Sequence, residues 1–178
     1  MPARFPQIAV LRDGKKLLIR PFANHDTDGL YEFFQGLPDE TRKFAWDDIT
    51  NRALIERWAQ RIDYSKVLPL LALEGSAIVA DATLHRRNSG PLRHVGRIKW
   101  LIGEDYRGQG LGTTLVNQFI TIAREDGLRR LTCMLIGEAE ADAIRTLSEL
   151  GFDRYVIPGY GADPEGQAHD MVKLVLQL

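Results

Sequence analysis

The sequence lacks the features that mark several common classes of protein. Its 178 residues include one cysteine, Cys133, which excludes an intramolecular disulfide and a cysteine-built metal cluster. No stretch approaches the roughly 18 apolar residues of a membrane span, and the N-terminus has no apolar run of the signal-peptide kind. Lys and Arg number 23 against 24 Asp and Glu, so the basic surplus of a dedicated nucleic-acid binder is missing. We expect a cytoplasmic protein without metal, nucleic-acid or membrane partners, with a homodimer as one option for its assembly.

The residues that are present predict one globular domain over residues 1–178, of which 1–14 form an N-terminal extension and first strand. Apolar residues make up 44% of the chain and charged residues 26%, too apolar a composition for disorder. We find no internal repeat, low-complexity tract or linker. A chain of 20.1 kDa is long enough to bury a core without a disulfide or metal.

The spacing of apolar residues changes along the chain between strand and helix periods. An initial hairpin is expected around Asp13-Gly14, followed by a helix that Asn24 or Asp26 could cap and a second helix from about Thr50. Further helices are expected from within the segment after Tyr106 and over residues 140–150. Strands are expected over residues 67–73, 77–85, 93–102, 130–136, 152–157 and 171–178, with a loop over Pro158–Gly166.

The segment Trp100–Phe119 carries the clearest chemical signal: a strand, a glycine-rich loop and a helix that begins inside the loop. Glycine at positions 108, 110 and 112 removes side chains that would keep a ligand from the backbone. Amide groups at a helix N-terminus favour an anion, so the segment predicts a phosphate or pyrophosphate site. The alternative is a tight strand-to-helix turn in which glycine only relieves packing.

Known nucleotide-binding fingerprints fit this loop poorly. A dinucleotide fingerprint that starts at Gly108 would need a sixth-position glycine where the chain has Thr113. A Walker A loop would need a lysine after Gly112, which is absent. A nicotinamide-dependent oxidoreductase is therefore disfavoured.

The order of several motifs resembles the GNAT N-acetyltransferases, of the bacterial protein-lysine acetyltransferase type. The loop reads Arg-x-x-Gly-x-Gly from Arg107 and follows the strand Trp100–Ile102. Lys16–Pro21 resembles the family's first strand, Gly151-Phe152 its penultimate element and Asp170–Leu178 its last strand. The resemblance covers roughly residues 15 to 178 in the family's order.

The resemblance implies an α/β (α+β) fold of the GNAT type and acetyl-CoA as cosubstrate. The fold would hold a central mixed, mostly antiparallel sheet of about seven strands, flanked by about four helices and splayed at the acetyl-CoA cleft. An amine of a small molecule or a protein would attack the thioester directly, and a backbone amide of the strand before the loop would stabilise the oxyanion. The implied cofactor-binding residues are Trp100, Leu101, Ile102, Arg107, Gly108, Gln109, Gly110, Leu111, Gly112 and Thr113.

The family's catalytic side chains are replaced at three positions. Leu147 stands where many relatives carry a tyrosine acid, Glu140 where they carry asparagine, and Arg97 where the lysine acetyltransferase type carries a glutamate base. His94 and Glu138 are the candidates that remain for base or acid. Arg97 and Lys99 share the strand face opposite Trp100 and are candidates for binding a carboxylate or phosphate of the acceptor. A cross-strand contact for His94 and solvated positions for the other three are the alternatives.

Two classes of function therefore stay open. The first is an acetyl-CoA-dependent N-acetyltransferase, in which proximity and a backbone oxyanion site supply much of the rate. The second is a non-catalytic module that binds acyl-CoA and regulates a partner. The three replaced side chains are what keep the second class in consideration.

Overall fold

The computed structural model describes residues 4–178, which fall into two compact units. The first unit runs up to Thr83 and includes Trp100–Thr114; the second comprises Leu84–Lys99 and Leu115–Leu178. The whole glycine loop therefore belongs to the first unit. No helix in the described residues is long and apolar enough to cross a membrane. That residues 1–178 form one domain stays a prediction.

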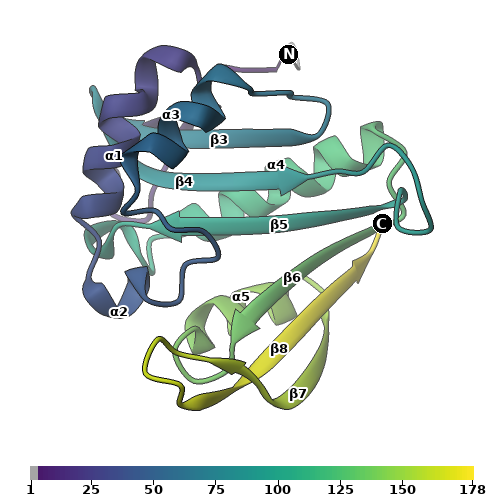
Figure 1. Cartoon of the computed structure of the whole chain (residues 1–178). Helices are drawn as coiled ribbons and strands as arrows, with labels where there is room; N and C mark the ends of the chain where they lie inside the picture. Colours follow the sequence, from purple (N-terminus) through teal and green to yellow (C-terminus); the bar gives the residue numbers. More distant parts are fainter. Residues whose placement is uncertain (1–3) are drawn as a thin grey trace. The chain divides into compact units, whose positions relative to one another are not determined.

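The described residues form one sheet of eight strands, most of which are antiparallel to their neighbours (Figure 1). The strand order is β1-β2-β3-β4-β5-β6-β8-β7. β5 and β6 are parallel, in register over Val95–Arg97 and Arg130–Thr132. This sheet and five α-helices confirm the predicted mixed fold, with one strand and one helix more than expected. The strands are β1 Gln7–Val10, β2 Lys16–Pro21, β3 Val67–Glu74, β4 Ala77–His85, β5 Val95–Ile102, β6 Arg130–Ile136, β7 Asp153–Ala162 and β8 Ala168–Gln177.

The core of the first unit lies between its helices and its strands. The helices are α1 Thr27–Gln35, α2 Asp39–Arg42 and α3 Arg52–Gln60, and Figure 1 shows α1 and α3 beside β3 and β4. Phe34 of α1, Ile55 of α3 and Leu71 of β3 belong to one fully buried cluster. Burying each such side chain contributes about 2 kcal/mol, so the cluster holds the helices on the sheet.

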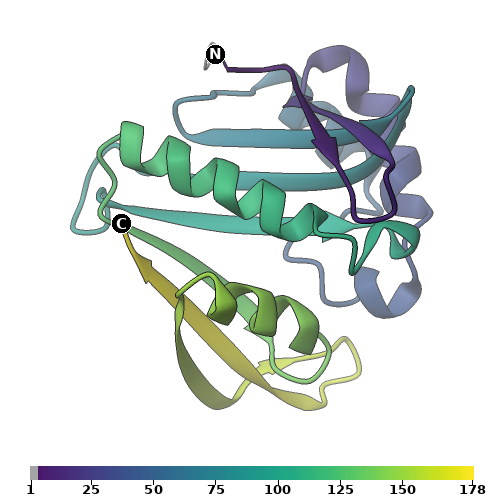
Figure 2. The same ribbon diagram turned by 180° about the vertical axis from the view of Figure 1, so that it is seen from behind.

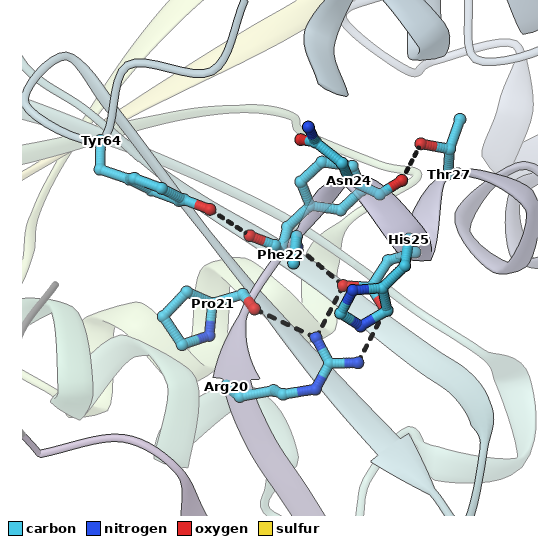
Figure 3. A network of polar contacts seen from close by, with 9 residues as sticks. Arg20, Pro21, Phe22, Asn24, His25, Thr27 and Tyr64 are labelled. Carbon is cyan, nitrogen blue, oxygen red and sulfur yellow. Dashed lines mark hydrogen bonds and ion pairs between the residues drawn. The ribbon is translucent and has the colours of Figure 1, made fainter. Parts of the chain in front are cut away.

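A buried ion pair fixes the passage from β2 into α1 (Figure 3). The Arg20 guanidinium donates two hydrogen bonds of 2.7 Å to the two carboxylate oxygens of Asp26. Asp26, which is 6% exposed, also accepts a 2.7 Å hydrogen bond from the Ala23 amide. The Tyr64 hydroxyl donates to the Phe22 carbonyl oxygen at 2.6 Å. The segment between β2 and α1 is thus held by the side chains of Arg20, Asp26 and Tyr64.

The prediction that Asn24 or Asp26 caps the first helix is confirmed for the position of Asp26, which is the N-cap residue of α1, but its side chain makes no cap hydrogen bond. Residues Asn24–Asp26 form a short 3-10 helix before α1, and neither side chain accepts a hydrogen bond from an α1 amide as its cap. The Asp26 carboxylate instead bonds Arg20 and the Ala23 amide, because β2 brings the Arg20 guanidinium within reach.

The second unit contains most of α4 (Leu111–Glu125), together with α5 (Ala141–Glu149), β6, β7 and β8. Figure 2 shows α5 in front of the strands of this unit, and Leu147 of α5 is fully buried. In β5, a Cβ on Gly96 would lie 2.8 Å from Leu131 and 2.9 Å from Leu84 and Leu128. A side chain at this position would therefore require the three leucine side chains to shift.

The predicted boundary between the strand over residues 152–157 and the loop that follows it was wrong. The expected loop at Pro158–Gly166 begins later, because β7 continues to Ala162 and pairs Gly161 with His169 of β8. The ladder has an irregularity between Ile157 and Gly161, which accommodates proline and glycine in an edge strand. A Cβ on Gly161 would lie 2.8 Å from the Met171 sulfur, so this glycine marks a close contact and not a turn.

Candidate functional site

The glycine loop connects the end of β5 to the start of α4. After Ile102 the chain forms a 3-10 helix at Glu104–Tyr106, a turn over residues 107–110, and then α4 from Leu111. Gly108 and Gly110 have φ values of +69° and +88°, the left-handed region that only glycine enters without strain. A Cβ on Gly108 would meet nothing within 4 Å. The backbone of the loop is therefore open on this side.

The loop and the first turn of α4 have the properties of an anion site. The Thr114 amide donates to the Gly110 carbonyl at 3.0 Å, and this bond closes the first turn of the helix. Helix geometry leaves the amides of Leu111, Gly112 and Thr113 without an intrahelical acceptor. α4 is 15 residues long, and its dipole adds partial positive charge at this end. The residues present therefore fit a phosphate group.

Arg107 fastens the loop to two other parts of the first unit. Its Nε donates to the Ile102 carbonyl oxygen at 3.0 Å. Its Nη2 donates at 3.0 Å to the hydroxyl of Thr41, a residue of α2. These two bonds use the Nε and the Nη2 groups of the guanidinium. Arg107 therefore holds the loop at β5 and α2, and its contact with the cofactor stays a prediction.

The side chain of Tyr106, the residue before Arg107, contacts two other residues of the first unit. Its hydroxyl donates to a Glu74 carboxylate oxygen at 2.7 Å, and the Lys15 ammonium lies 5.1 Å from its ring centroid. The hydrogen bond to Glu74 and burial raise the pKa of Tyr106 to about 12. The phenol therefore stays protonated at neutral pH, bound to Glu74.

A residue that sequence reasoning missed also contacts the loop. The backbone amide of Arg12, between β1 and β2, donates to the Gln109 carbonyl at 3.1 Å. The Nη1 of the Arg12 side chain donates to the Gly108 carbonyl at 3.2 Å, and the two residues are 96 positions apart in the sequence. Figure 2 shows the turn of this hairpin beside the start of α4. No local pattern around Arg12 indicates a contact with the loop.

The backbone of β5 presents its polar groups to two sides in alternation. The Gly103 amide donates to the Val79 carbonyl of β4 at 2.9 Å. Because successive residues of a strand point their amides to opposite edges, those of Trp100 and Ile102 face away from β4. The Ile102 carbonyl, on the same edge, accepts the bond from Arg107. Trp100 and Ile102 both lie beyond Arg97, which is the last residue of β5 in the register given by the described residues for its pairing with β6.

The other predicted site residues belong to the second unit. His94 is half-buried in the turn before β5, where its carbonyl oxygen accepts hydrogen bonds from the amides of Arg129 and Arg130. Glu138 is exposed in the turn after β6. Arg97 is exposed and Lys99 half-buried on β5, while their neighbour Ile98 is fully buried, as the predicted alternation requires. All four are proposals for the site, because the loop and these residues lie in different units.

Comparisons with known proteins decide the family. The model of the acetyltransferase (GNAT) family matches residues 28–152, more than half of the chain. The chain belongs to this family. As a GNAT acetyltransferase it is an N-acetyltransferase that uses acetyl-CoA as the acetyl donor. The resemblance inferred from the loop and from the order of the strands is thereby confirmed.

Relatives of the chain show the same family and fold. Acetyltransferase PA5475 of Pseudomonas aeruginosa is 28% identical over 137 residues, which are 68% of this chain and 67% of that protein. The GNAT domain of S. lividans PAT superposes with a TM-score of 0.81 at 22% identity, covering 100% of this chain and 99% of that one. The structure of yncA from Salmonella typhimurium, solved with its cofactor acetyl-CoA, gives a TM-score of 0.76 at 20% identity, covering 92% and 95% of the two chains.

Two of the three positions where this GNAT chain departs from the predicted catalytic pattern have structural roles. Leu147 is fully buried in α5, and its carbonyl oxygen accepts the Phe152 amide at 3.0 Å. A Glu140 carboxylate oxygen accepts the Ile136 amide at 2.6 Å, where β6 ends. Arg97 lies opposite Thr132 in the parallel ladder. Leu147 and Glu140 therefore serve packing and the end of β6.

Cys133 is unsuited to nucleophilic catalysis in this GNAT chain. It is 2% exposed in β6, opposite Leu174 of β8. Burial raises the pKa of its thiol, and the charge of Glu140 adds to the effect. Only the thiolate is nucleophilic, so the cysteine acts as a small core residue.

Proposed function

We propose that the chain transfers the acetyl group directly from acetyl-CoA to a primary amine of a small molecule or a protein. The observation that carries this proposal is the loop itself: two glycines with positive φ lead into the N-terminus of α4. We assign the backbone of residues 108–113 to the pyrophosphate of acetyl-CoA. Direct transfer is supported by Cys133, because the only cysteine of the sequence is buried and its pKa is raised.

The edge of β5 that faces away from β4 supplies the second part of the proposed site. The amides of Trp100 and Ile102 face away from β4 and lie beyond the registered pairs with β6. We assign the Ile102 amide to the thioester carbonyl, where it would stabilise developing negative charge. A positioned backbone donor contributes about 3 kcal/mol to such a step and depends on no particular side chain. The backbone of Trp100 and Leu101 is assigned, together with that of Ile102, to the acetyl carbonyl and the pantetheine arm.

The proton transfers are assigned to His94 and Glu138. A neutral imidazole or a carboxylate can accept the proton that the amine loses. His94 is half-buried and Glu138 is exposed, so both can exchange protons with water. Family membership favours this enzymatic role over a non-catalytic acyl-CoA-binding module. A cytoplasmic location and a homodimer stay predictions from the sequence.

Arg97 and Lys99 are proposed to bind an anionic group of the acceptor. Both carry positive charge on one face of β5, and Arg97 is exposed. If a carboxylate or phosphate of the acceptor binds there, replacing both with alanine should raise the acceptor KM roughly tenfold, because hydrogen bonds to charged groups contribute about 1.5–3 kcal/mol. The KM for acetyl-CoA should not change.

Measuring the release of coenzyme A with a panel of amines tests the proposed acetyl transfer and the proposed role of Arg97 and Lys99. The panel should contain free amino acids, polyamines and lysine-containing peptides, each with and without an anionic group. We expect amine-dependent release of coenzyme A and formation of the acetylated amine. Arg130→Ala serves as a control, because Arg130 is exposed on β6 and lies opposite Val95. An unchanged acceptor KM in the Arg97→Ala/Lys99→Ala variant would refute the role of these two residues.

A further inference from the structure

The turn between β1 and β2 contacts two successive residues of the glycine loop through Arg12. Its backbone amide is bonded to Gln109 and its guanidinium to Gly108, at 3.1 Å and 3.2 Å. A Cβ on Gly110 would lie 4.0 Å from the Arg12 Nε. Lys15 of the same turn lies over the Tyr106 ring. The family model matches residues 28–152 and does not include this hairpin.

The direction of these hydrogen bonds determines where the amides of the loop point. In a planar trans peptide the C=O and the following N–H point in opposite directions. The carbonyls of Gly108 and Gln109 are directed at Arg12. The amides of Gln109 and Gly110 are therefore directed away from the hairpin. These two amides belong to the segment that we assign to the pyrophosphate.

The loop needs such a restraint because its glycines can turn. Gly108 and Gly110 have positive φ, and glycine passes between positive and negative φ at little cost. Rotation of the peptide planes next to Gly108 or Gly110 would point carbonyl oxygens, in place of amides, at the anion. Arg12 opposes this rotation with two hydrogen bonds, and its guanidinium carries a permanent positive charge.

We propose that Arg12 is a positioning residue of the acetyl-CoA site, which holds the Gln109 and Gly110 amides toward the pyrophosphate. The N-terminal hairpin is then a functional part of this acetyltransferase and not an extension of it. The inference rests on the assignment of residues 108–113 to the pyrophosphate. It concerns the binding of the donor and predicts no effect on the acceptor.

The test compares Arg12→Ala and Arg12→Lys with two donors. S-acetylpantetheine carries the thioester without any phosphate, so it reports on the rest of the site. For Arg12→Ala we expect kcat/KM with acetyl-CoA to fall about tenfold, the size expected for a lost hydrogen bond from a charged donor. With S-acetylpantetheine it should stay within twofold of the wild-type value, and Arg12→Lys should recover part of the loss. All variants keep the backbone bond to Gln109.

Two controls separate positioning from other effects. Lys16→Ala removes a charge from the same hairpin, where Lys16 is exposed and pairs with Val10, and should change neither donor's kinetics more than twofold. A third donor, 3′-dephospho-acetyl-CoA, should show the same tenfold loss in Arg12→Ala. A loss seen only when the 3′-phosphate is present would assign Arg12 to that phosphate and overturn the positioning role.

The remaining outcomes distinguish this inference from the proposed function. If the wild type prefers acetyl-CoA and Arg12→Ala keeps the full preference, the role of Arg12 is overturned while the pyrophosphate assignment stands. Equal losses with acetyl-CoA and S-acetylpantetheine would also overturn it, because they indicate a general structural defect. If the wild type uses both donors equally well, the pyrophosphate assignment fails and the inference fails with it.

Discussion

Gly110→Asp is expected to weaken the binding of acetyl-CoA by at least about thirtyfold while the protein stays folded. Gly110 has a φ of +88°, which costs a side-chain-bearing residue about 1–2 kcal/mol. The new carboxylate would stand at the start of α4 and repel the pyrophosphate, adding about 1–2 kcal/mol at effective surface dielectric constants. Calorimetric titration with acetyl-CoA measures the loss.

Two variants separate charge from backbone strain in this experiment. Gly110→Asn has the same shape without the charge, and asparagine tolerates positive φ, so it should lose clearly less affinity than Gly110→Asp. Gly90→Asp introduces an aspartate at a φ of +81° in the turn before β5, where a Cβ would meet nothing within 4 Å. It should bind acetyl-CoA as the wild type does. Equal losses in the Asp and Asn variants at position 110 would mean that no anion binds near this residue.

Asp26→Asn is expected to cause the largest loss of stability among single polar substitutions considered for this chain. The change leaves the Arg20 guanidinium, whose side chain is 23% exposed, without its carboxylate partner. Breaking a buried pair costs about 3–5 kcal/mol, and partial exposure of Arg20 reduces the expected loss to about 2–3 kcal/mol. Urea unfolding followed by circular dichroism measures the difference. Asp28→Asn is the control, because its pair with Arg52 is exposed and should contribute less than about 1 kcal/mol.

The contribution of Asp26 should depend on pH in a defined direction. Burial alone would raise the pKa of Asp26, but the hydrogen bonds from Arg20 and Ala23 outweigh it and lower the pKa below its ordinary value of 3.8. A lowered pKa in the folded state stabilises the fold above the unfolded-state pKa. The difference between wild type and Asp26→Asn should therefore be constant from pH 5 to 7 and shrink as the pH falls below about 4. A difference that is independent of pH down to pH 2 would exclude this ion pair as its source.

The sequence predicts the loop of the site well because its determinants are local. The glycines at 108 and 110, the strand before them and the apolar face of α4 lie within about twenty residues, and each has a direct structural consequence. The restraints on the loop are different. Arg12 and Thr41 reach the loop across 96 and 66 positions, and no pattern near either residue indicates this contact. Such contacts depend on which strands become neighbours.

The same distinction explains the errors in the fold. Glycine and proline in Pro158–Gly161 resemble a loop, yet Gly161 is paired in β7 and lies close to the Met171 side chain of the neighbouring strand. Asp26 occupies the N-cap position of α1 as its sequence context predicts, but the hydrogen-bond partner of its side chain is fixed by β2. Strands with a buried face, such as β6 at Arg130–Ile136, were predicted with their exact bounds because the apolar run alone determines them.

The central claim, that residues 108–113 hold the pyrophosphate of acetyl-CoA, is tested most directly by calorimetric titration of the wild-type protein with three compounds. Acetyl-CoA should bind in the micromolar range, and coenzyme A should bind as well because it carries the same pyrophosphate. NAD, which the loop with Thr113 does not suit, should not compete at similar concentrations. Absence of acetyl-CoA binding at millimolar concentration, or tighter binding of NAD, would contradict the account.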